Sequence, residues 1–137
     1  MDEQALVWDH FKLNAEQRLK SFNFFLLVAI FVNGGVINAI DKELSPTLLL
    51  LLGIFLCVLS FVFWLADTRS KHLLKLSVDA LLEMEASYQE RFQLFRIDKA
   101  SRSAVARYTV AIATLLCVQF VFGFVLAVYA TCQLVRQ

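Results

Sequence analysis

The stretch Pro46–Ala66, PTLLLLLGIFLCVLSFVFWLA, contains no charged residue over 21 positions. An α-helix rises about 1.5 Å per residue, and the hydrocarbon core of a bilayer is about 30 Å thick, so about 20 apolar residues cross it. A helix in the core of a soluble domain would be shorter or would show a polar face. This stretch is therefore predicted to be a membrane-spanning helix, and the rest of the chain is arranged around it.

Composition indicates that lipid, not water, surrounds much of the chain. The 137 residues are 59% hydrophobic and 18% charged, and a soluble domain of this size has too much surface to hide that many apolar groups. Four glycines and one proline are too few for the turns of a β-barrel. We therefore predict an all-α integral membrane protein with membrane lipid around it. The formal net charge of +1 argues against direct binding of nucleic acid.

Two other uncharged runs are long enough to cross a membrane. Ser21–Ile40 is near the minimum length, and Thr109–Val135 is long enough to span with tilt. The polar turn Asp41–Ser45 separates the first two spans, and Pro46 follows at a helix start, where its missing N–H is tolerated. We predict transmembrane helices at residues 21–40, 46–66 and 109–135.

Three side-chain amides interrupt these apolar runs. Asn33 and Asn38 lie in the first span and Gln119 in the third. A buried amide seeks a partner on a neighbouring helix, so the three residues are candidates for interhelical hydrogen bonds. The alternative is a face toward a water-filled lumen, because polar groups deep in lipid usually point inward. The sequence pattern leaves both interpretations open.

Residues 1–20 are predicted to form an amphipathic helix on the cytoplasmic side. Their apolar residues recur at steps of three and four, the spacing of one helix face: Trp8, Phe11, Ala15 and Leu19. This face would lie on the cytoplasmic leaflet or against a neighbouring helix. The alternative is a contact between subunits of an oligomer.

The segment 67–108 is predicted to be a cytoplasmic helical region. No Gly or Pro interrupts the chain between Gly53 and Gly123, so a helix can run far below the membrane before a bend returns the chain, at 86–90 or at 98–103. A heptad-like stripe follows one face and is a candidate seam for self-association; it comprises Leu74, Val78, Leu81, Glu85, Tyr88, Phe92 and Phe95. Glu85 either pairs with a Lys or Arg of a neighbour or lies at the solvent-exposed edge of the stripe.

Lys and Arg residues set the expected orientation. With three crossings, the N-terminal and central segments together carry eleven of them, and the first loop and the C-terminal tail carry two. Cytoplasmic loops are enriched in Lys and Arg. The N-terminus and the central segment are therefore expected in the cytoplasm and the C-terminus outside.

The chain contains none of the common catalytic or nucleotide-binding motifs. GxGxxG, Walker, HExxH and GxSxG patterns are all missing from the sequence. Asp9 and His10 are adjacent, so on a helix they point apart and form no dyad. Cys57, Cys117 and Cys132 show no metal-binding spacing and are interpreted as small apolar packing residues. We expect no enzyme activity, no cofactor and no metal.

The layout resembles small helical membrane proteins of prokaryotic antiviral loci. Two stretches carry the resemblance: HFKLNAEQRLKSFNFFLL (residues 10–27), which enters the first span, and FWLADTRSKHLLKLSVDALLEMEASYQERF (residues 63–92), which leaves the second. They are similar to the two-span SLATT effectors and to the pore-forming accessory proteins beside RNA-targeting CRISPR nucleases. The third span departs from the two-span layout. The resemblance implies oligomerisation and permeabilisation of the cell inner membrane on infection.

Two functional hypotheses follow from the sequence. In the first, the chain is a homo-oligomeric membrane effector, whose copies pack through the central helices and whose amides border a conduit. In the second, it is a membrane scaffold or regulatory subunit without a pore, which recruits a cytoplasmic protein partner through the central helices.

Overall fold

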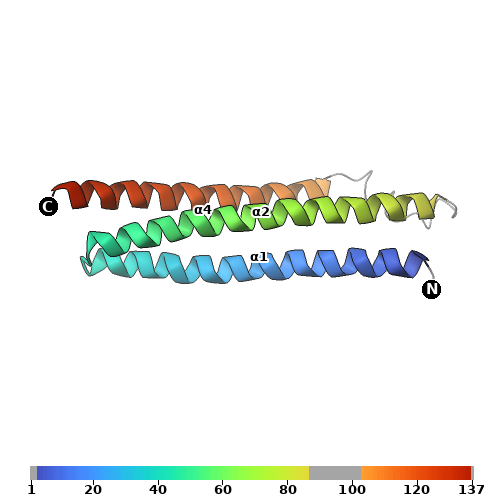
Figure 1. The fold of residues 1–137 in the computed structure, drawn as a ribbon, viewed down its shortest axis with the longest axis horizontal. Helices are drawn as coiled ribbons and strands as arrows, with labels where there is room; N and C mark the ends of the chain where they lie inside the picture. The colour runs from blue at the N-terminus through green and yellow to red at the C-terminus, as the bar shows by residue number, and fades with distance from the viewer. Residues whose placement is uncertain (1–2, 87–102, 137) are drawn as a thin grey trace. The chain divides into compact units, whose positions relative to one another are not determined.

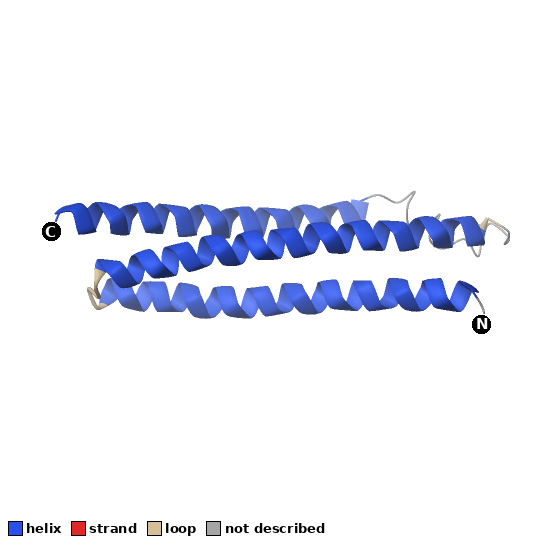
Figure 2. Cartoon of the chain, viewed as in Figure 1, coloured by secondary structure: helices blue, strands red, loops and turns tan. Residues whose placement is uncertain are grey.

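The structure, a computed structural model, describes residues 3–86 and 103–136 of the chain. Three α-helices account for almost all of these residues: α1 (Glu3–Asp41), α2 (Pro46–Glu85) and α4 (Ser103–Arg136) (Figure 1). The described residues contain no strand, and a short turn joins α1 to α2 (Figure 2). α1 continues without a break from residues 3–20, the described part of the predicted N-terminal helix, into the predicted first span, residues 21–40.

All three helices are long and apolar enough to cross a membrane. The stretches that meet this criterion are Ala5–Asp41, Pro46–Glu85 and Tyr108–Arg136. This finding confirms the predicted class, an all-helical protein with three helices long and apolar enough to span a membrane. In each helix the most apolar window of 18 residues is only 22% buried, so most of its side chains face outward, where a bilayer would solvate them.

The turn between α1 and α2 follows from local chemistry. Glu43 adopts the left-handed conformation, with φ of 48°, and the Leu44 N–H donates to the carbonyl of Ala39 at 2.9 Å. The Glu43 N–H donates to Ile40 at 3.1 Å, which completes a Schellman motif at the end of α1. Pro46 then starts α2 as its first residue, so the chain reverses within four residues.

Contacts divide the chain into two compact units. Unit 1 comprises Met1–Lys20 and Ala66–Ala111, and unit 2 comprises Ser21–Leu65 and Ile112–Gln137. The polar and charged residues dominate unit 1, and the uncharged runs make up most of unit 2.

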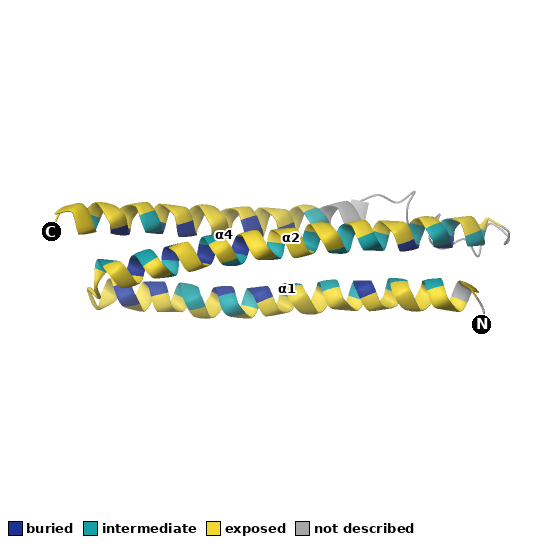
Figure 3. Cartoon of the chain, in the orientation of Figure 1, coloured by how far each residue is buried: buried dark blue, intermediate teal, exposed yellow. Residues whose placement is uncertain are grey.

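Unit 2 is a bundle of three helical segments around two apolar clusters. The first cluster is formed by Val36, Ala39, Leu49, Leu56, Leu126 and Ala130. The second is formed by Phe25, Ala29, Ile112 and Leu116, against which Phe63 packs with its ring 5.0 Å from that of Phe25. Buried positions face neighbouring helices, and exposed positions cover the outer surfaces (Figure 3). The centre of this bundle is therefore filled with side chains.

Two glycines bring the backbones of α2 and α4 together in unit 2. A Cβ placed on Gly53 would lie 2.8 Å from the backbone N of Ala127 and from the carbonyl O of Gly123. A Cβ on Gly123 would lie 2.9 Å from the carbonyl O of Gly53. Small residues at such crossings let membrane helices pack closely. By contrast, no neighbouring group among the described residues lies within 4 Å of a Cβ on Gly34 or Gly35.

Unit 1 pairs the start of α1 with the end of α2, and its interior is partly polar. Leu81, Ser77 and Asn14 are its buried residues among those described, with exposed fractions of 4%, 4% and 7%. Several large aliphatic side chains remain exposed, including Leu6, Leu13 and Leu76. An exposed aliphatic cluster of this kind is typical of an interaction surface.

Candidate functional site

The amide side chains of Asn33 and Gln119 bind each other inside unit 2. The Gln119 Nε2 donates to Asn33 Oδ1 at 2.9 Å, and the Asn33 Nδ2 donates to Gln119 Oε1 at 3.2 Å. Both residues are half-buried. The reciprocal pair joins α1 to α4 and satisfies one donor and one acceptor on each amide, so in this structure the two residues act as an interhelical bond.

Asn38 does not join this pair. Its side chain is exposed and has no hydrogen bond to the described residues. Gly34, one turn before it on α1, is also exposed. The three amides singled out in the sequence therefore separate into an inward pair and one outward residue.

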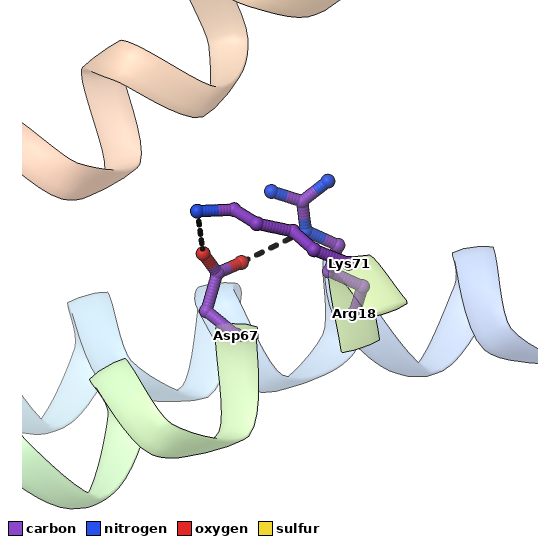
Figure 4. Close-up of polar contacts among 3 residues, drawn as sticks. All are labelled: Arg18, Asp67 and Lys71. Atoms are coloured by element: carbon purple, nitrogen blue, oxygen red, sulfur yellow. Dashed lines mark hydrogen bonds and ion pairs between the residues drawn. The ribbon is translucent and has the colours of Figure 1, made fainter. Parts of the chain in front are cut away.

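A cluster of three charged residues lies in unit 1 where the uncharged stretches begin (Figure 4). The Arg18 Nε donates to Asp67 Oδ1 at 2.8 Å, and the Lys71 Nζ lies 2.7 Å from Asp67 Oδ2. The Arg18 and Asp67 side chains are only 11% and 10% exposed. The Arg18 guanidinium also lies over the Tyr108 ring, 5.6 Å from its centroid, within range of a cation–π interaction.

A second polar contact in unit 1 joins His10 and Ser77. The His10 Nδ1 lies 2.7 Å from Ser77 Oγ, and Ser77 Oγ lies 3.1 Å from the Leu73 carbonyl, to which it donates. Asn14 donates to the His10 carbonyl at 2.8 Å. A groove of about 550 Å³ lies over His10 and Ser77; it is lined by Leu6, Val7, Asp9, Leu13, Leu76 and Ala80. Its walls are mainly aliphatic, as in a site that accepts an apolar group.

The candidate self-association seam lies only partly within the described residues. Leu81 is buried, and Leu74, Val78 and Glu85 are half-buried. Tyr88, Phe92 and Phe95 lie outside the described residues, as do the predicted bends after Ala86. Self-association through the seam stays a prediction.

Sequence reasoning did not identify the Arg18–Asp67 and His10–Ser77 contacts. Each joins α1 to α2, with partners 49 and 67 positions apart. The midpoint of both pairs falls between residues 42 and 44, within the turn. In an antiparallel helical hairpin, residues equidistant from the turn lie side by side, so the turn position was the signal that predicts both pairs.

The described residues hold no group of three or more His, Cys, Asp or Glu side chains that could bind a metal ion. The described residues form ion pairs and hydrogen bonds between helices, and they line an aliphatic groove.

Comparison with known proteins gives one informative similarity. No protein-family model matches the chain, and no solved structure matches it. The chain is similar to CD-NTase-associated protein 19 of Escherichia coli. The two are 29% identical over 97 residues, which is 69% of this chain and 64% of CD-NTase-associated protein 19. The match therefore spans less than two thirds of that relative's length.

Proposed function

We propose that the chain is a homo-oligomeric membrane effector of antiviral defence, which permeabilises the inner membrane of an infected prokaryotic cell. The observation that carries the proposal is the similarity to CD-NTase-associated protein 19, a relative that supports an association with phage defence. Three helices apolar enough to cross a membrane give the chain the architecture of a membrane effector.

The proposed conduit forms between copies of the chain. Val36 and Leu56 are fully buried at the centre of unit 2, so the described residues of unit 2 leave no room for a water-filled path between its helical segments at this point. Copies that pack side by side around an axis normal to the membrane would build the conduit at their contacts.

The proposed orientation places unit 1 in the cytoplasm and the C-terminus outside. The N-terminal and central segments carry eleven of the thirteen Lys and Arg residues, and such residues are retained on the cytoplasmic side. The effector would carry out no chemical reaction and need no cofactor. A cytoplasmic signal acting on unit 1 would control it, in a cell that also contains a CD-NTase.

Induced expression with a membrane-potential dye tests this function. Wild-type chain is expected to depolarise cells when phage infects them, and to reduce plaque formation. The variant Leu56→Arg places a charge at a fully buried position of unit 2 and serves as the inactive comparison. At equal protein level it is expected to abolish the depolarisation and the reduction in plaque formation. Unchanged polarisation of infected cells with wild-type chain would contradict the proposal.

A second candidate function is a scaffold that recruits a cytoplasmic partner without forming a pore. The aliphatic groove of unit 1 favours it, because exposed Leu13 and Leu76 line the groove and such grooves bind amphipathic helices. Leu76→Lys in a pull-down discriminates the two functions. The scaffold predicts loss of a foreign protein, and the effector predicts loss of other copies of this chain.

A further inference from the structure

The charged cluster of Arg18, Asp67 and Lys71 contains more positive than negative charge. Asp67 uses one carboxylate oxygen for each cation, so two cations share one anion. The cluster carries a net charge of +1; its Arg18 and Asp67 side chains are 11% and 10% exposed, and its Lys71 side chain is 34% exposed. A partly buried net charge is costly unless a counter-charge or hydrogen bonds compensate it. The site therefore favours an additional anion.

The guanidinium of Arg18 has unused hydrogen-bonding capacity. Its Nε donates the hydrogen bond to Asp67, and the terminal nitrogens point away from the carboxylate (Figure 4). Nη2 is buried and has no hydrogen-bond partner among the residues that the structure describes. Guanidinium groups bind phosphate oxygens in a planar, two-pronged geometry. The unpaired edge thus suits a phosphate group.

The position of the cluster along the helices indicates where such a phosphate comes from. Asp67 directly follows the uncharged stretch that ends at Ala66, and Arg18 precedes the uncharged stretch that begins at Ser21. Phospholipid headgroups lie at this depth, just outside the hydrocarbon. Tyr108, against which Arg18 packs, is the type of side chain that is enriched at membrane interfaces.

We propose that Arg18 and Lys71 form a binding site for the phosphate of an anionic phospholipid in the leaflet next to unit 1. The Arg18 terminal nitrogens donate to the phosphate oxygens, and the Lys71 ammonium adds a second positive charge. Asp67 contacts both cations but neutralises only one of the two positive charges, so one positive charge remains for the phosphate. Basic pockets between membrane helices bind anionic headgroups in the same way. The site does not depend on whether the chain forms a pore.

Thermal unfolding of the 137-residue chain in neutral detergent tests the site. Phosphatidylglycerol, phosphatidylcholine and inorganic phosphate are each titrated into the protein. For each compound, the concentration that gives half of the maximal rise in melting temperature is measured. Both lipids present a phosphate, but the choline ammonium of phosphatidylcholine cancels the charge of its phosphate and is repelled by the net positive charge of the cluster. Phosphatidylglycerol is therefore expected to act at concentrations about tenfold lower than phosphatidylcholine. An equal effect of both lipids would overturn the proposal, and equal potency of inorganic phosphate would overturn the assignment to a lipid.

Three variants separate specific binding from general attraction. Arg18→Gln is expected to weaken the phosphatidylglycerol response about tenfold, whereas Arg69→Gln, the same charge change at an exposed position nearby, changes it less than about twofold. Asp67→Asn keeps the shape of the side chain but raises the net charge of the cluster, and is expected to strengthen the response. Equal losses in Arg18→Gln and Arg69→Gln, or a weaker response in a folded Asp67→Asn variant, would overturn the site.

Discussion

Asn33 and Gln119 show how a polar side chain is accommodated in an apolar helix. In water, an amide that loses its partner hydrogen-bonds to solvent, but in hydrocarbon it stays unsatisfied. The reciprocal hydrogen bonds at 2.9 and 3.2 Å remove that cost for one donor and one acceptor on each residue. The pair also specifies how α1 and α4 face each other, because only one rotation of the two helices brings both amides together.

Removing one member of this pair should destabilise the chain more than removing both. Asn33→Leu leaves the Gln119 amide without its partner, and we expect a loss of about 1 kcal/mol in the free energy of unfolding. The double variant Asn33→Leu/Gln119→Leu is expected to recover part of the loss, because no polar group is then unsatisfied. Unfolding in detergent measures both.

The matched control for that comparison is Asn38→Leu, which replaces an exposed amide one or two turns along the same helix. It should change the stability little. The double variant should lose less free energy of unfolding than the two single variants lose together. A larger loss would contradict the role assigned to the pair.

At the scale of helices, the structure depends on close approach and on how each helix ends. Gly53 and Gly123 allow the backbones of α2 and α4 to meet, and Glu43 ends α1 in a left-handed conformation. The first feature brings helices together, and the second sets the point at which the chain reverses. At these positions, the presence of a Cβ atom affects the helix packing or the turn more than the polarity of the side chain does.

A methyl group at the α2–α4 crossing should be poorly tolerated. Gly123→Ala places its Cβ 2.9 Å from the Gly53 carbonyl, so the helices must move apart, at an expected cost of about 1 to 3 kcal/mol. Gly34→Ala is the matched control, because its Cβ would have no neighbour within 4 Å in the part of the chain that the structure describes, and it should be neutral or slightly stabilising. Equal stability of the two variants in a thermal unfolding experiment would show that α2 and α4 do not cross here.

Glycine at position 43 should stabilise the chain. The left-handed conformation of Glu43 strains any residue with a Cβ, by roughly 1 kcal/mol relative to glycine. Glu43→Gly is therefore expected to raise the melting temperature in detergent, whereas Glu43→Val, with a branched Cβ, should lower it. The opposite order would mean that the turn does not adopt this conformation.

The uncharged runs predicted three long apolar helices, but not how far α1 and α2 extend beyond the runs, nor the contacts between the helices. Pro46 was expected at a helix start because it lacks an N–H, and α2 begins there. The unbroken passage of α1 through Lys20 and Ser21 was not predicted, because a change from polar to apolar residues alters the solvent of a helix and not its backbone. The Gly53–Gly123 contact depends on the rotation of α4, which local sequence does not encode.

The candidate site was predictable only in part. The amides of Asn33 and Gln119 were identified by their polarity, but their pairing needs the register of the first and third helices. Arg18 and Asp67 lie at nearly equal distances along the chain from the turn, so the position of the turn would have predicted that they lie side by side. The seam beyond Ala86 lies outside the described residues, so its role stays a prediction.

At the scale of the whole chain, the outward surface indicates the solvent. Val135 is 83% exposed, Phe31 76% and Ile30 68%, and lipid accommodates such side chains at no cost. We expect several copies to associate in that solvent. The mass of the detergent-solubilised particle measures this, and a particle holding one copy of the chain at all protein concentrations would contradict the homo-oligomer.

The most direct test of three membrane crossings is the location of the two chain ends. An odd number of crossings places Met1 and Gln137 on opposite sides of the membrane. A fluorescent protein fused before Met1 should fluoresce in the cytoplasm, and alkaline phosphatase fused after Gln137 should be active outside it. If the phosphatase is inactive and the same fusion is cleaved only by a cytoplasmic protease, both chain ends lie on the same side of the membrane. That result would contradict three membrane crossings.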